Sequence, residues 1–151
     1  MASKKQKGKL PTICLDEHAN FMRPSFQSMR VIEISKTKLK GMDERNFIST
    51  TLYEWNGIFV TCDQEFVAEI AENIHLRHAG IVFIPKGMTK DEKLLFGEIV
   101  CGYIRGACIH GKFALQNTIF YPGYNGLRSI YMGKDLLEIS WDRFQQKLNL
   151  E

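Results

Sequence analysis

The sequence lacks long apolar runs and low-complexity tracts. No segment approaches the roughly 20 consecutive apolar residues that a membrane-spanning helix needs. The polar start of the chain is not followed by the apolar stretch of a secretion signal. Only 4 of the 151 residues are proline and 25% are charged, a composition that argues against a largely disordered chain. We therefore expect a folded cytoplasmic protein without a membrane partner.

Motifs of several common protein classes are also missing. The chain has no G-x-S-x-G elbow, no G-x-x-x-x-G-K-[ST] loop and no G-x-G-x-x-G fingerprint, which weakens hydrolase, ATPase and dehydrogenase interpretations. No C-x-x-C pair is present and the 4 histidines are scattered, so a zinc site is not expected. The 4 cysteines lie in apolar surroundings and are predicted to be reduced core residues: Cys14, Cys62, Cys101 and Cys108.

What the chain does have is enough apolar sequence for one core. Apolar residues make up 44% of the 151 residues, and aromatic residues 11%. We expect a basic disordered tail at residues 1–10, one domain over 11–108, and a C-terminal extension over 109–151 packed on it. The net charge of +3 is uneven, because residues 1–40 hold nine Lys or Arg against three acids. This excess suits contact with a polyanion, although basic tails are often only solubilising.

Short apolar runs alternate with helical patterns along the domain. Strands are predicted at 11–16, 30–34, 58–62 and 80–84, with helices over 20–28 (interrupted at Pro24), from 43, from 63, and over 89–107. Strands that are apolar on both faces indicate a parallel sheet covered on two sides. We therefore predict an α/β three-layer sandwich around a mainly parallel four-stranded sheet. The segments at 117–121 and 128–132 flank a turn and predict a hairpin in the extension, and 141–148 predicts a last short helix.

Acidic residues follow three of the predicted strands. Asp16 and Glu17 end the first strand, Asp43 and Glu44 begin the helix after the second, and Asp63 and Glu65 follow the third. In open α/β sheets, ligands bind outside the carboxyl ends of the strands. Carboxylates held together there repel one another unless a cation or a proton neutralises them, and such hard oxygen ligands select Mg²⁺ or Mn²⁺. The pattern therefore predicts a metal site.

Helix capping is the competing explanation. Asp16, Asp43 and Asp63 stand at N-cap positions, and Glu44 and Glu65 lie in first turns, where they favour the helix dipole. Capping explains each acid taken alone. It explains neither the doubled acid at each strand end nor Thr61, whose hydroxyl two residues before Asp63 can orient a carboxylate.

Four segments together resemble the PIN-like domain family, in its compact branch with toxin-type and Mut7-C-type nucleases. They are L-D-E-H at 15–18, D-E-R-N-F-I at 43–48, V-T-C-D-Q-E-F at 60–66 and G-I-V-F-I at 80–84. The resemblance covers residues 12–107 with order and spacing intact, and does not include the extension.

This resemblance implies a metal-dependent ribonuclease that hydrolyses RNA, with one or two Mg²⁺ or Mn²⁺ ions activating a water. Asp16, either Asp43 or Glu44, and Asp63 match the family's metal-binding and catalytic acids. Glu65 occupies a position where many relatives have a second Asp, and its longer side chain would bind metal through water. Relatives of this type are often toxins paired with an inhibitor protein, which would be a partner here.

Basic residues near the same sheet edge are candidates for substrate binding. Lys36, Lys38 and Lys40 leave the second strand there and, with Arg45 and Thr61, are predicted to contact RNA phosphates. A solvated loop is an equal alternative. The aromatic residues of the extension are candidates for base stacking or a homodimer face, or are simply packed: Phe120, Tyr121, Tyr124 and Tyr131.

Two other functions remain open from the sequence. A PIN-like fold that binds RNA or a protein partner without cleaving is the main alternative to the nuclease. A phosphate-accepting receiver domain ranks below both, because Pro85-Lys86 after the fourth strand only loosely approximates its lysine.

Overall fold

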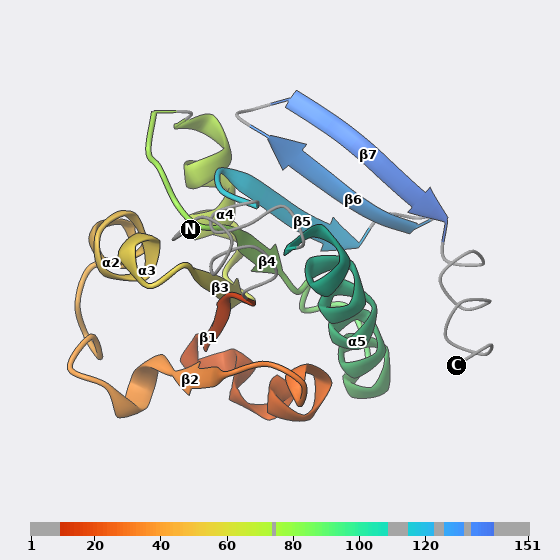
Figure 1. The fold of residues 1–151 in the computed structure, drawn as a ribbon, viewed down its shortest axis with the longest axis horizontal. Coiled ribbons are helices and arrows are strands. Elements are labelled where there is room, and N and C mark those ends of the chain that lie inside the picture. Colours follow the sequence, from red (N-terminus) through yellow and green to blue (C-terminus); the bar gives the residue numbers. More distant parts are fainter. Residues whose placement is uncertain (1–9, 74, 109–114, 123–125, 132–133, 141–151) are drawn as a thin grey trace, which may run out of the picture.

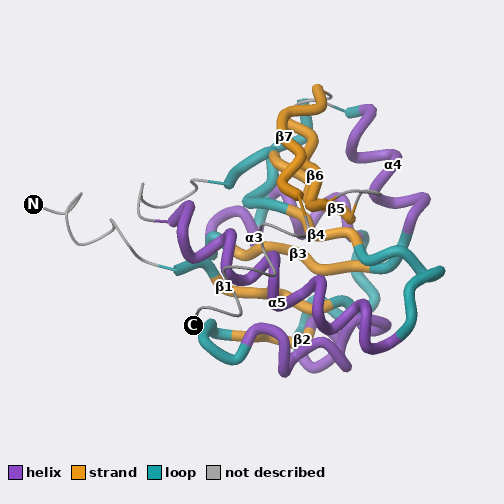
Figure 2. Tube along the Cα trace, turned by 90° about the vertical axis from the view of Figure 1, so that its right-hand side faces the viewer, coloured by secondary structure: helices purple, strands orange, loops and turns teal. Residues whose placement is uncertain are grey.

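One seven-stranded sheet organises the part of the chain that the computed structural model describes, residues 10–73, 75–108, 115–122, 126–131 and 134–140. Its order is β2-β1-β3-β4-β5-β6-β7, and Figure 2 shows the strands stacked in this order, from β2 at the bottom to β7 at the top. The strands are β1 (Thr12–Leu15), β2 (Val31–Glu33), β3 (Gly57–Thr61), β4 (Ile81–Phe83), β5 (Thr118–Pro122), β6 (Gly126–Tyr131) and β7 (Lys134–Ser140). The helices are η1 (Glu17–Phe26), η2 (Ile34–Lys36), α2 (Glu44–Ser49), α3 (Thr51–Glu54), α4 (Gln64–Glu72) and α5 (Lys90–Ala107).

The sheet is parallel from β2 to β5 and antiparallel beyond β5. The α/β class and the mainly parallel sheet are therefore confirmed, and so is the β5–β6 hairpin. The predicted four-stranded sheet is wrong, because β5 pairs with β4 and makes the extension part of the same sheet. Apart from Leu10, the expected tail lies outside the described residues, as does the expected helix at 141–148. No helix among the described residues is long and apolar enough to cross a membrane.

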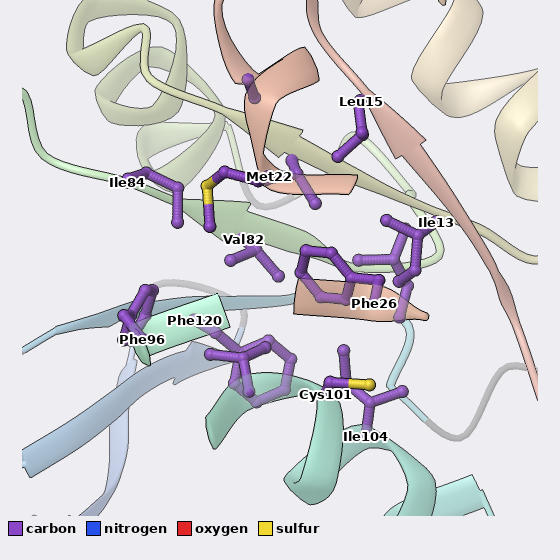
Figure 3. Packing of buried hydrophobic residues seen from close by; sticks show 14 of the residues in the cluster. Ile13, Leu15, Met22, Phe26, Val82, Ile84, Phe96, Cys101, Ile104 and Phe120 are labelled. Atoms are coloured by element: carbon purple, nitrogen blue, oxygen red, sulfur yellow. The ribbon is translucent and has the colours of Figure 1, made fainter. Parts of the chain in front are cut away.

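Helices cover both faces of the parallel part of the sheet (Figure 1). On one face, Ile13 and Leu15 of β1 pack with residues of η1 and α5. On the other face, Cys14 of the same strand packs with residues of α2, α3 and α4. Figure 3 shows the first cluster, in which side chains from β1, β4, β5, η1 and α5 converge. The alternation follows from the two-residue period of a strand, so apolar residues at successive positions supply both layers.

Local sequence signals explain several element boundaries. Pro24 lacks an N–H donor and lies within η1, which is a 3₁₀ helix rather than a regular α-helix. Asn56 adopts a positive φ of 54° between α3 and β3, a conformation that Asn tolerates better than most residues. Thr89 and Glu92 form a complete capping box at the start of α5.

The crossing of η1 and α5 depends on Gly97. A Cβ atom at Gly97 would lie 2.7 Å from Met22 Cε and 2.7 Å from Ser25 Cβ. Ser25 also donates a hydrogen bond of 2.8 Å from its hydroxyl to the Leu94 carbonyl, which fixes the two helices together. Gly97 thus permits the close packing of η1 against α5. This packing also fixes the position of Asp16, which directly precedes η1.

On the opposite face, Phe59 of β3 holds the starts of α2 and α4. Its ring makes edge contacts with Phe47 at 5.6 Å and with Phe66 at 5.8 Å between centroids. Phe47 follows Glu44 by three residues, and Phe66 follows Asp63 by three residues. Packing around one aromatic side chain therefore brings two of the predicted acidic segments to the same edge of the sheet.

Candidate functional site

The candidate site lies between β1 and β3, where the order of the strands in the sheet reverses. The parallel part has the order 2-1-3-4-5, so the connections after β1 and β3 leave toward opposite faces, into η1 and α4. In doubly wound sheets of this order, ligands bind at such a switch point. Leu15 is paired with Val60, so Asp16 and Thr61 meet at the carboxyl end of the two strands.

The Thr61 hydroxyl connects the two acids that follow these strands. It donates a hydrogen bond of 2.9 Å to Asp16 Oδ2 and accepts one of 3.1 Å from the Asp63 backbone N–H. Its side chain is fully buried, at 0% exposure. Thr61, predicted to bind substrate, therefore lies behind Asp16 and orients its carboxylate.

Asp16 and Asp63 also cap the helices that they precede. Asp16 Oδ1 accepts a hydrogen bond from the Glu17 N–H at 2.8 Å, and Asp63 Oδ1 accepts one from the Phe66 N–H at 3.1 Å. The capping interpretation is thus correct for these two acids. It does not exclude a ligand, because each carboxylate has about four acceptor positions and these bonds use only some of them.

Glu44 is the acid that shares this edge with Asp16 and Asp63. Its side chain is half-buried, and its pKa is raised, first by desolvation and then by the negative charges of Asp16, Asp63 and Asp43. These charges can act on Glu44 only if they lie near it. The α2 segment thus adds a third carboxylate to the two that follow β1 and β3.

Asp43, the other candidate in this segment, faces solvent. It is exposed, and its Oδ1 lies 3.7 Å from Arg45 Nε. It makes no side-chain cap bond to α2, so the capping interpretation is wrong for this residue. The sequence left open whether Asp43 or Glu44 belongs to the acidic site. Glu44 is the half-buried one of the two.

Glu65 is less closely associated with the cluster. It is exposed in the first turn of α4, and it is not among the charges that raise the pKa of Glu44. Its position agrees with a helix-dipole role.

Two of the four predicted substrate-binding cations are engaged elsewhere. Lys36 Nζ lies 3.2 Å from Glu33 Oε2, which also accepts a hydrogen bond from Arg23, and these two cations lower the pKa of Glu33. Arg45 forms ion pairs with Asp43 and Glu69. Lys38 and Lys40 are exposed between η2 and α2.

Two lysines that were not assigned to the site act electrostatically on Cys62, which lies between Thr61 and Asp63. Burial raises the pKa of the Cys62 thiol, and the charges of Lys93, Asp16 and Lys86 also act on it. Lys86 comes three residues after β4, and Lys93 lies in the first turns of α5. The same strand-end rule that selected the acids could have selected them.

The donor set suits a hard cation held partly through water. Within the described ranges, no group of three or more His, Cys, Asp or Glu side chains is arranged to hold a metal ion directly. Mg²⁺ commonly retains several waters and is bound through only one or two carboxylates. Asp16, Glu44 and Asp63 are the described carboxylates that could bind such a hydrated ion.

Comparison with known proteins does not extend this description. No protein-family model matches the chain, and no curated protein or solved structure matches it significantly.

Proposed function

We propose that the protein is a metal-dependent ribonuclease that hydrolyses RNA phosphodiester bonds with Mg²⁺ or Mn²⁺. The observation that supports this best is the half-buried Glu44, whose pKa is raised by burial and by Asp16 and Asp63. Three carboxylates from three loops at a strand-end switch point would be mutually destabilising without a cation. The resemblance to PIN-like domains adds the substrate class, RNA.

The chain's own residues would prepare this site before any ligand binds. The buried Thr61 hydroxyl fixes the orientation of Asp16, and the α4 backbone fixes Asp63. Preorganised carboxylates lose little conformational entropy on binding a cation. A bound Mg²⁺ or Mn²⁺ supplies a water of lowered pKa and stabilises charge on the attacked phosphate.

Three further parts of this proposal rest on the resemblance alone. They are a water-mediated metal contact by Glu65, a role as the toxin of a toxin–antitoxin pair, and an inhibitor protein as partner. A homodimer also stays a prediction: Phe120 is buried in the core and Tyr131 is exposed, whereas Tyr124 lies outside the described residues.

A second candidate function is binding of RNA or a protein partner without hydrolysis. The position of Glu65 favours it, because this acid is exposed and is not among the charges that raise the pKa of Glu44. The same fold can carry different functions, and the site decides between them.

Cleavage of end-labelled RNA in Mn²⁺, Mg²⁺ or EDTA tests the first proposal. Wild type is compared with Asp16→Asn and Asp63→Asn, because Asn keeps a side-chain oxygen for capping while it removes the charge. We expect metal-dependent cleavage by wild type that is lost in both variants. Glu98→Gln, an exposed acid on α5, is the control and should cleave normally.

Metal binding is measured separately from cleavage. Mn²⁺ should raise the melting temperature of wild type and of Glu98→Gln, but not of Asp16→Asn, because a ligand that binds only the folded state stabilises it. RNA binding by folded wild-type protein without cleavage in either metal would favour the second candidate function.

A further inference from the structure

The edge of the sheet beyond Cys62 forms a second side of the candidate site. Thr61 is paired with Phe83, and the Ile84 N–H donates a hydrogen bond of 2.9 Å to the Thr61 carbonyl. The segment that carries Lys86 therefore runs beside the residues that follow β3. Lys86 is exposed and follows Ile84 by two residues, so it lies at the same edge of the sheet as the end of β3.

Lys93 approaches the same place from α5. Its side chain is half-buried, and its Nζ lies 5.8 Å from the centroid of the Phe21 ring in η1. The start of η1 is fixed beside Cys62, whose thiol lies 3.9 Å from the His18 carbonyl. The ammonium group of Lys93 thus lies between α5 and the helix that begins directly after Asp16.

Both lysines act electrostatically on the Cys62 thiol, as Asp16 does. Such interactions weaken with distance and with screening, which agrees with the placement of the two lysines by β4 and by η1. Cys62 follows Thr61 directly and precedes Asp63.

Neither lysine forms an ion pair within the described part of the chain. By contrast, Lys36, Arg23 and Arg45 each have a carboxylate partner. Glu92, the acid next to Lys93, accepts a hydrogen bond from the Thr89 N–H at 2.9 Å in the capping box. Two positive charges without an ion-pair partner among the described residues therefore lie on the β4–α5 side of the strand ends, where carboxylates alone would repel a polyanion.

We infer that Lys86 and Lys93 bind a backbone phosphate of single-stranded RNA on the β4–α5 side of the site. This inference rests on the proposed function, since RNA is the substrate that the site would hydrolyse. An ammonium group contacts phosphate without reading sequence, so the two lysines position the strand and do not select bases. They take the role that the sequence assigned to Lys36, Lys38 and Lys40.

RNA binding in EDTA tests this inference independently of hydrolysis. Anisotropy of a labelled single-stranded RNA is measured over a range of salt concentrations for wild type, Lys86→Gln, Lys93→Gln and the double variant. Each lost phosphate contact should reduce the slope of log K against log salt by roughly 0.7. Lys90→Gln, an exposed lysine at the start of α5, should leave the slope unchanged.

The outcomes separate the two proposals. Weaker binding and a smaller salt slope in the double variant, restored by Lys86→Arg with Lys93→Arg, support the lysine contact even if no RNA is ever cleaved. If the double variant has the same salt slope as Lys90→Gln, the lysine contact is ruled out, even if wild type cleaves RNA. Failure of folded wild type to bind the RNA at low salt overturns it as well.

Discussion

Thr61 and Asp16, separated by 45 residues in the chain, are joined by a hydrogen bond of 2.9 Å from the threonine hydroxyl to Asp16 Oδ2. The hydroxyl has one proton, and this bond uses it. The donor is fully buried and its acceptor lies at the surface of the site, so the orientation of Asp16 is set from within the core.

Thr61→Val should weaken metal binding and cleavage while preserving the fold. Outer-sphere partners of metal ligands typically contribute about 10–100-fold to affinity or activity, and loss of the hydrogen bond should cost about 1 kcal/mol of stability. Melting temperature and RNA cleavage are measured over a range of Mn²⁺ concentrations. The melting temperature reports stability and metal binding, and the cleavage rate reports activity. Thr61→Ser keeps the hydroxyl and should retain the metal response, so an equal loss in both variants would contradict an orienting role.

Glu44→Gln should stabilise the metal-free protein at neutral pH. The raised pKa of Glu44 means that its ionised form is disfavoured in the folded state, by burial and by neighbouring carboxylates, and glutamine removes that charge. Urea denaturation in EDTA measures the change. Asp43→Asn is the matched comparison and should have a smaller effect, because Asp43 is exposed and lies beside Arg45. Greater stabilisation by Asp43→Asn would show that the wrong acid has been assigned to the cluster.

Gly97→Ala should destabilise the domain by about 1–3 kcal/mol, because the added methyl group overlaps Met22 and Ser25 in a packed helix crossing. Gly102→Ala lies in the same helix with nothing within 4 Å of the added carbon. It should instead stabilise the domain by up to about 1 kcal/mol through helix propensity. Thermal or urea denaturation of both variants checks the opposite signs, and equal effects would contradict the packing described for η1 and α5.

Stability should fall on acidification because of His78. Burial lowers its pKa to about 4, from the ordinary 6.5 of an unfolded histidine. The unfolded chain therefore takes up a proton at a higher pH than the folded protein. The contribution of His78 is complete above pH 6.5 and is lost as the pH falls to about 4, by up to about 3 kcal/mol.

Urea denaturation of His78→Leu across this pH range checks the assignment. The backbone of His78 is bonded to Asn117 at both its N–H and its carbonyl, so the substitution changes only the side chain. The variant should lose part of the acid dependence, whereas His75→Gln, at an exposed histidine, should retain it. A pH dependence of His78→Leu that matches wild type would show that another group is responsible.

Local signals in the sequence predicted most elements, because they act within a few residues of the boundaries that they set. Pro24 and the caps at Asp16 and Asp63 are examples. The place of β5 was not predictable in this way. Its apolar run fits a hairpin strand, and only contact with β4 reveals that it also continues the parallel sheet.

The sequence by itself determined the α/β class and brought Asp16, Asp63 and the Asp43–Glu44 pair to one sheet edge, because strand ends in a parallel sheet meet there by geometry. Only the tertiary structure decided which acid of that pair is half-buried, that Thr61 supports Asp16 from the core, and that Lys86, Lys93 and Asp16 all act on the Cys62 thiol. The reason is physical. Side-chain direction, burial and ion pairing depend on neighbours far away in the chain, and the apolar period that predicts strands and helices carries no information about them.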